Sequence, residues 1–278
     1  MMFTVANSIA VAVYIIGFCD ALLDMLDQYM TGYNGIVALP TDRINDIRLI
    51  GSISLVLILG LAIVGMDWVT RVQMGLLVLL VCSQIDFIIG SFIPSNDEEK
   101  SKGFVGYNYS VLTENLWSDY RQIEGTTKKN NFFSLFAVFF PAVTGIVAGA
   151  NLSGDLKDPG MAIPRGTLAA IATTYASYIV YAVIVAACSL RDASGVVEEL
   201  TFGTDAFNET AGEILNITRT FTDCEGRKCE YGTVHSFQMM ELISAWGPLI
   251  YMGCFAGTFA ATLSCYFYYY YLLLIIYY

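Results

Sequence analysis

Long apolar runs separated by polar loops occupy most of this chain. A helix needs about 20 predominantly apolar residues to cross a bilayer. Six runs near that length lie at residues 3–19, 49–66, 73–95, 132–150, 167–188 and 242–276. The pattern therefore predicts a bundle of membrane-spanning helices over residues 1–278.

The fourth run is unusual because it places helix-breaking residues at mid-depth. Pro141, Thr144, Gly145 and Gly149 follow the apolar start of this run. Lipid offers no water to replace lost backbone hydrogen bonds, so a break there needs a purpose. In secondary transporters an unwound stretch presents carbonyl groups to cations and a helix N-terminus to anions. The run predicts a discontinuous helix with an ion site, although a proline kink with packing glycines fits the local pattern equally well.

Composition and charge agree with a multi-pass membrane protein. Hydrophobic residues make up 56% of the chain and charged residues only 14%, well below the content of a soluble domain. Most of the net charge of -11 arises in the loops 20–48, 96–131 and 189–240, where 20 acids face 11 bases, whereas charges in the short loops 67–72 and 151–166 cancel. Because cytoplasmic loops are relatively enriched in Lys and Arg, we assign the short loops to the cytoplasm and the loop 189–240 to the exterior.

Glycosylation signals fit this topology. Asn208 and Asn216 each begin an acceptor sequence in the loop 189–240, and Asn108 begins a weaker candidate in another outer loop. Asn151 also begins an acceptor sequence, but it lies in a predicted cytoplasmic loop, where it would stay unmodified.

The cysteines divide by location. Five lie in or beside apolar runs, where free cysteine behaves as a small hydrophobe. Cys224 and Cys229 instead flank Glu-Gly-Arg-Lys in the outer loop, and this oxidising setting favours a disulfide between them. A free pair and a metal site with His235, the single histidine, are the alternatives.

Several stretches together resemble the sodium-dependent branch of the cation-chloride cotransporters. The similarity covers roughly residues 3 to 265. The stretches are Ala6-Asn7-Ser8-Ile9-Ala10 through Gly17-Phe18, Ile44-Asn45-Asp46-Ile47-Arg48, Gly90-Ser91-Phe92-Ile93-Pro94, Pro141-Ala142-Val143-Thr144-Gly145 through Ile163-Pro164, and Ala261-Thr262-Leu263-Ser264. The resemblance implies an all-α amino-acid-permease-like (LeuT-type) core with inverted repeats, of which this chain holds helices three to eight.

The resemblance also implies the ion sites. Potassium would be bound by Tyr14, Pro141 and Thr144, and chloride by the backbone amides of Gly145, Ile146 and Val147. The alternative for Tyr14 is an ordinary buried tyrosine that bonds a neighbouring carbonyl group.

The implied sodium site lies on the last span, at Ala261, Ser264 and Cys265. Cys265 stands where the family has a second hydroxyl, and its soft sulfur is a poor ligand for a hard cation, so sodium binding is the weakest assignment. The tyrosine-rich tail after Cys265 also departs from the small residues of the family, and a truncated or misread gene explains it as well as a genuine helix end.

We therefore predict an electroneutral symporter of sodium, potassium and chloride in the plasma membrane, not an enzyme, inactive as this chain alone. The alternatives are a sodium-chloride symporter without potassium and a non-transporting fragment that only associates with full-length relatives. Expected partners are inorganic ions, the lipid bilayer and a second copy bound through family regions outside this chain. We expect no cofactor and no nucleic acid. Asp86 and Glu241 lie near span ends, where a structural role is the simpler interpretation.

Overall fold

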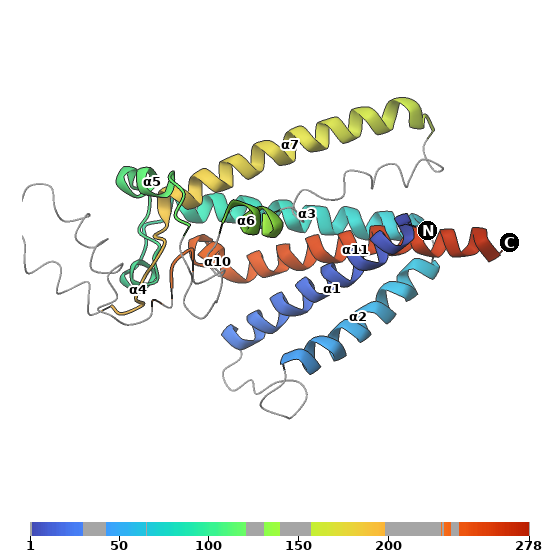
Figure 1. The fold of residues 1–278 in the computed structure, drawn as a ribbon, viewed down its shortest axis with the longest axis horizontal. Coiled ribbons are helices and arrows are strands. Elements are labelled where there is room, and N and C mark those ends of the chain that lie inside the picture. The colour runs from blue at the N-terminus through green and yellow to red at the C-terminus, as the bar shows by residue number, and fades with distance from the viewer. Residues whose placement is uncertain are drawn as a thin grey trace, which may run out of the picture. The chain divides into compact units, whose positions relative to one another are not determined.

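The computed structural model describes residues 2–29, 43–64, 66–120, 131–139, 157–197, 229, 231–234 and 239–277. This part of the chain contains helices, connecting loops and two isolated bridge pairs, Phe104 with Ser189 and Ala193 with Tyr231. The helices, labelled in Figure 1, are α1 (Met2–Tyr29), α2 (Arg43–Val64), α3 (Met66–Ser91), α4 (Asp97–Ser101), α5 (Tyr109–Asn115), α6 (Phe132–Phe139), α7 (Pro159–Cys188), α10 (Met239–Ile243) and α11 (Gly247–Tyr277).

Five of these helices are long and apolar enough to cross a membrane. The spans are Ser8–Leu26, Arg43–Leu61, Trp68–Ser91, Pro159–Cys188 and Gly247–Cys265. They overlap five of the six predicted runs. Of the remaining run, 132–150, the structure describes only the beginning, where α6 forms.

The first two spans extend further into polar sequence than the hydrophobic pattern predicts. α1 continues through Asp20 and Asp24, and α2 begins at Arg43 rather than near residue 49. The Arg43 guanidinium lies 2.7 Å from the Asp24 carboxylate and 3.4 Å from that of Asp20. Because these charges neutralise one another across the two helices, helical structure continues where a hydrophobicity scale predicts a loop.

Local sequence explains the other helix boundaries. α7 begins at Pro159 because Asp158 caps it, accepting a hydrogen bond of 3.4 Å from the Met161 amide, and because proline suits the first turn. The predicted run 242–276 is divided between α10 and α11, and the second helix begins directly before Pro248.

The described helices belong to two compact units. Unit 1 contains α1, α2, α11 and α3 up to Asp86, and unit 2 contains the rest of α3 with α4, α5, α6, α7 and α10. The core of unit 1 is built on one stripe of α1, at Val11, Ile15, Cys19 and Leu23, which recur every four residues. Ile50, Ile58, Val69 and Leu263 from the other helices of the unit complete this core.

In unit 2, α5 and α7 cap each other. The last carbonyl groups of a helix have no partner within that helix. Here the Ala186 and Ser189 carbonyls accept hydrogen bonds of 2.9 and 2.8 Å from the Asn115 carboxamide nitrogen. The Arg191 guanidinium in turn donates to the Glu114 and Trp117 carbonyls at the end of α5, beside α7 in Figure 1. This reciprocal capping fixes the short α5, which is too short to be stable alone.

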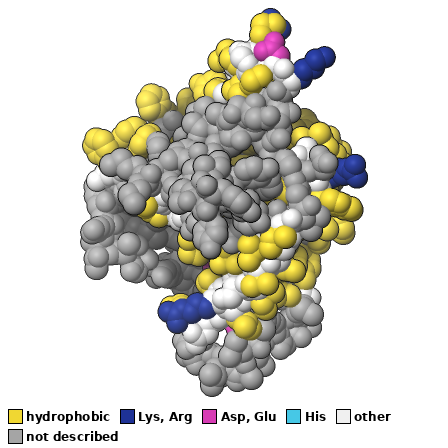
Figure 2. All heavy atoms as spheres, turned by 90° about the vertical axis from the view of Figure 1, so that its right-hand side faces the viewer, with side chains coloured by type: hydrophobic (Ala, Val, Ile, Leu, Met, Phe, Trp, Pro, Cys, Tyr) yellow, Lys and Arg dark blue, Asp and Glu magenta, His cyan; other side chains and the backbone are white. Residues whose placement is uncertain are grey.

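The exposed side chains agree with a lipid environment. On the face drawn in Figure 2, the described side chains are largely hydrophobic and the charged groups are few. Large apolar residues are exposed on each span, for example Val56 on α2, Val78 on α3 and Leu168 on α7. Contiguous apolar surface of this kind is unfavourable in water and expected in a bilayer.

Candidate functional site

Small residues allow α3 and α11 to approach closely within unit 1. A Cβ atom added at Gly253 of α11 would overlap the Ser83 hydroxyl of α3, and one at Gly257 would lie 3.3 Å from a Leu80 methyl group. Close approach at small residues is how membrane helices gain packing energy, since lipid supplies little hydrophobic force between helices. We call this contact the α3–α11 seam.

One polar contact lies further along the α3–α11 seam. The carboxamide nitrogen of Gln73 donates a hydrogen bond of 2.9 Å to the Ser264 hydroxyl oxygen. Ser264 donates its own proton to the Ala260 carbonyl, at 3.0 Å. The Ser264 oxygen and the carbonyl oxygen of the Gln73 carboxamide are hard ligands, the kind that an alkali cation prefers.

The packing register brings Tyr14 to the same level as this contact. Gly17 of α1 faces Thr258 of α11 at 3.8 Å, and the Tyr29 and Tyr251 rings meet further along, so the two helices are antiparallel. Continuing this register by one turn towards the start of α1 places Tyr14 level with Ala261. Tyr14, which is predicted to bind potassium, thus lies at about the same level of unit 1 as the residues predicted to bind sodium, and both sites remain predictions.

The predicted sodium ligands differ in their surroundings. Ser264 takes part in the bond to Gln73, whereas Cys265 is a free cysteine that packs against the hydrophobic core of unit 1. α11 is continuous through Ala261, so helix geometry directs the carbonyl of that residue to the amide of Cys265. Among these residues Ser264 therefore offers the most accessible oxygen.

Other predicted sites fall wholly or partly outside the described residues. The residues of the predicted helix break, Pro141, Thr144, Gly145, Ile146 and Val147, lie outside them, as do Cys224, Asn208 and Asn216. The ion sites at the break therefore remain predictions.

Two outer-loop predictions can be placed. Cys229 is disulfide-bonded, and its predicted partner lies outside the described residues. Asn108 caps α5 through its carboxamide oxygen, which accepts bonds of 3.0 Å from the Ser110 amide and 2.7 Å from the Ser110 hydroxyl. A glycan would be attached at the carboxamide nitrogen instead. The pairing and the glycosylation both remain predictions.

Comparison with known proteins identifies the family. The pattern described as "Amino acid permease" matches residues 1–273. The chain belongs to the amino acid permease family. It is 41% identical over 264 residues to solute carrier family 12 member 1 of Mus musculus and 42% identical over 264 residues to member 2 of Homo sapiens. It is 37% identical over 266 residues to member 3 of Mus musculus.

These relatives confirm the resemblance to the cation-chloride cotransporters and the predicted fold class. Each alignment covers 95% of this chain, and the chain spans between 20% and 25% of the length of these relatives. The five apolar helices and the relatives also confirm a multi-pass protein of the plasma membrane.

Sequence reasoning missed Gln73. The signal was a carboxamide at the start of an apolar run that also holds Gln84 and Asp86, and an intramembrane polar side chain usually faces a partner inside the protein. It also missed the pairing of Arg43 with Asp20 and Asp24, because each of these residues was assigned to a loop.

Proposed function

We propose that this chain contributes to coupled, electroneutral transport of sodium, potassium and chloride across the plasma membrane. The observation that carries the proposal is the bond between Gln73 and Ser264, level with Tyr14 in the membrane-spanning part of unit 1. Polar side chains at this depth in a bilayer cost free energy, so their presence usually indicates a functional site. The similarity to three members of solute carrier family 12 supports the same proposal.

Coupling follows from the cost of isolated charge in the bilayer. A single cation bound at this depth is unfavourable, and a chloride bound beside it lowers the cost of both ions. Joint binding of cations and chloride would then precede a movement of one helix bundle against the other, as in other transporters with broken helices. In this mechanism Ser264 and Gln73 would hold sodium, Tyr14 would hold potassium, and the broken helix after α6 would supply the chloride site.

A chimera tests the proposal. Residues 3–266 of this chain replace the aligned segment of solute carrier family 12 member 2 of Homo sapiens, and rubidium-86 uptake is measured in cells while sodium and chloride are varied. We expect uptake that requires both ions. Ser264→Ala should raise the sodium concentration for half-maximal uptake about tenfold, because a hydrogen-bonding ligand to a charge is lost. Ser177→Ala is the matched control, since that exposed hydroxyl bonds only the Thr174 carbonyl of its own helix.

The same chimera separates the alternatives. If Tyr14→Phe leaves the dependence on rubidium concentration unchanged, the potassium assignment is wrong and sodium-chloride transport is favoured. Uptake that does not respond to sodium in the unmutated chimera, with normal surface expression, would refute the proposed function. The chain expressed without its relative's segments should show no rubidium uptake, and robust uptake would refute the prediction that it is inactive alone.

A further inference from the structure

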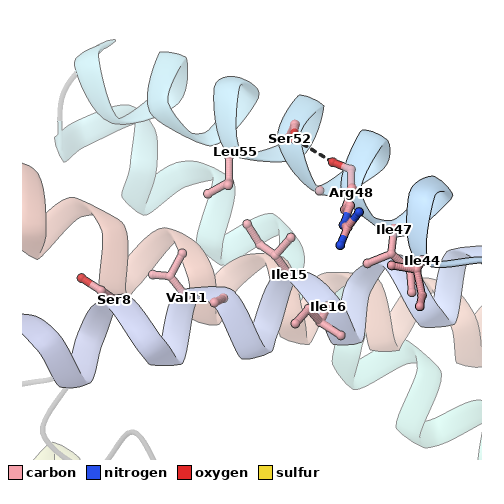
Figure 3. A pocket seen from close by; sticks show the side chains of 11 residues that line it. Ser8, Val11, Ile15, Ile16, Ile44, Ile47, Arg48, Ser52 and Leu55 are labelled. Carbon is pink, nitrogen blue, oxygen red and sulfur yellow. Dashed lines mark hydrogen bonds between the residues drawn. The ribbon is translucent and has the colours of Figure 1, made fainter.

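A groove lies between α1 and α2 within unit 1. Its volume is about 720 Å³. Figure 3 shows its lining, which is largely aliphatic. The main apolar contributors are Val11, Ile15, Ile16, Ile44, Ile47 and Leu55. Val11 and Ile15 are buried and form the floor, whereas Ile16, Ile44 and Leu55 are exposed and form the walls. The groove is therefore open along its length and suits a long aliphatic group.

The groove carries a positive charge about one turn of α2 from its end at Ile44. Arg48 of α2 lines it and points towards α1 in Figure 3. Its guanidinium makes one long hydrogen bond, of 3.5 Å, to Asn45 of the same helix, and it forms no ion pair with another described residue. The nearby carboxylates of Asp20 and Asp24 are engaged by Arg43. Arg48 therefore remains available to an anionic group from outside the protein.

The position of Arg48 in its span matches the depth of a lipid headgroup. The span runs from Arg43 to Leu61, so Arg48 lies about 8 Å from its beginning. A long arginine side chain at this depth reaches the interface while its stem stays among apolar groups. Leu55, at the other end of the groove, lies about 18 Å into the span, at the level of the acyl chains.

We propose that this groove binds a phospholipid, whose phosphate contacts Arg48 and one of whose acyl chains lies along α1 and α2. A guanidinium binds phosphate oxygens with two parallel hydrogen bonds, which gives the charged part of the groove its specificity. The apolar side chains between Ile44 and Leu55 would contact the acyl chain of the lipid. This site is independent of the proposed ion transport, because it requires only that α1 and α2 lie in a bilayer.

Photo-crosslinking tests the site. The purified 278-residue chain is placed in nanodiscs of unlabelled phosphatidylcholine with a small fraction of phosphatidylcholine that carries a diazirine within one acyl chain. Labelled residues are then identified by mass spectrometry. We expect labelling to concentrate on Val11, Ile15 and Leu55. Diacylglycerol with the same diazirine chain, which lacks the phosphate, should label these residues about tenfold less, as expected when a charge-assisted hydrogen bond is missing.

Three variants separate the phosphate contact from the groove itself. Arg48→Gln should remove the difference between the phospholipid and the diacylglycerol. Arg71→Gln is the matched control, because Arg71 lies on α3 over the Trp68 ring, and it should preserve the difference. Ala12→Leu should fill part of the groove and reduce labelling by both lipids, with Arg48 left in place.

Two results would overturn the proposal. The first is equal labelling by phospholipid and diacylglycerol in the unmutated chain. The second is labelling of Ile15 and Leu55 that neither Arg48→Gln nor Ala12→Leu changes. Competition by unlabelled sterol, without competition by unlabelled phosphatidylcholine, would assign the groove to a sterol and would also refute the phospholipid site.

Discussion

The helix contacts of unit 1 and those of unit 2 are made by different groups. In unit 1, α3 and α11 meet through side chains: Gly253 faces the Ser83 hydroxyl, and Gln73 bonds Ser264. In unit 2, many contacts end on backbone atoms, as where Asn115 donates to two carbonyls at the end of α7. Side chains can rotate to relieve a clash or find another partner, whereas backbone atoms inside fixed helices cannot.

This difference suggests that the two units tolerate substitution unequally. The side-chain seams of unit 1 should absorb small changes at modest cost, as membrane helix pairs do when an alternative partner is at hand. The backbone contacts of unit 2 should respond sharply, because a lost donor leaves a carbonyl group unpaired and an added atom has nowhere to go.

The largest effect should follow Gly90→Ala. A Cβ atom at Gly90 would overlap the backbone of Ile243, Ser244 and Ala245, all within unit 2. We expect the free energy of unfolding to fall by more than about 3 kcal/mol, measured by steric trapping or thermal denaturation in detergent. Gly75→Ala on the same helix is the control. Apart from the backbone of its own helix, no atom of the described residues lies within 4 Å of its added Cβ, so it should be neutral or stabilising by up to about 1 kcal/mol.

A somewhat smaller effect is expected for Asn115→Ala. This change removes both donors to the end of α7 and the oxygen that accepts a 3.0 Å bond from Arg191. Unfolding should become easier by about 2 to 3 kcal/mol, and amide hydrogen exchange should accelerate in α5. The control is Asn131→Ala, which removes an exposed cap of α6 worth about 1 kcal/mol. Equal costs for the two variants would contradict the proposed role of the mutual capping.

Gln73→Leu should have a milder consequence. The variant removes the bond to Ser264 but keeps apolar volume in the α3–α11 seam, so the loss should be about 1 kcal/mol. A double-mutant cycle with Ser264→Ala, scored by unfolding in detergent, isolates the pair. A coupling energy indistinguishable from zero would show that the contact does not stabilise the α3–α11 seam.

The smallest effect concerns a surface ion pair of unit 2. Lys102 lies 2.7 Å from Glu98, and its hydrogen bond, followed by its charge, lowers the pKa of the Glu98 carboxyl below its ordinary value. A lowered folded-state pKa adds stability at pH values above the ordinary carboxyl pKa, and this stability is lost as pH falls through the folded value. Titration of Glu98 by NMR in the chain and in Lys102→Gln checks this. The variant's pKa should be higher, and added salt should reduce the difference.

Hydrophobic runs predicted which segments form the spans but not where they end. α1 extends to Tyr29 and α2 begins at Arg43, because acids of one helix meet a base of the other. A pattern read along one segment has no access to a partner from the next segment, so charges that are neutralised in the fold were assigned to loops. The same limit applies to α5, whose existence depends on α7.

The sequence likewise predicted some residues of the candidate site but not the partner that contacts them. The family resemblance led to Tyr14 and Ser264, and the packing of α1 against α11 brings them to one level. Gln73 could not be assigned, because a carboxamide in an apolar run does not reveal which helix it faces, and Gln84 of the same run offered an equal candidate. Cys265 was predicted as a weak ligand on chemical grounds, and its packing against the hydrophobic core is in keeping with that expectation.

The hydroxyl groups of α11 have a consequence for membrane insertion. Thr258 donates to the Cys254 carbonyl at 2.8 Å, Thr262 to Thr258 at 2.7 Å and Ser264 to Ala260 at 3.0 Å. Each hydroxyl thus donates its hydrogen bond to a backbone carbonyl of the same helix, one turn earlier. Transfer scales treat such hydroxyls as bare polar groups, so these three residues lower the mean hydropathy of the span, 1.3, more than their bonded state warrants. Its real cost of entering hydrocarbon is smaller than that value suggests.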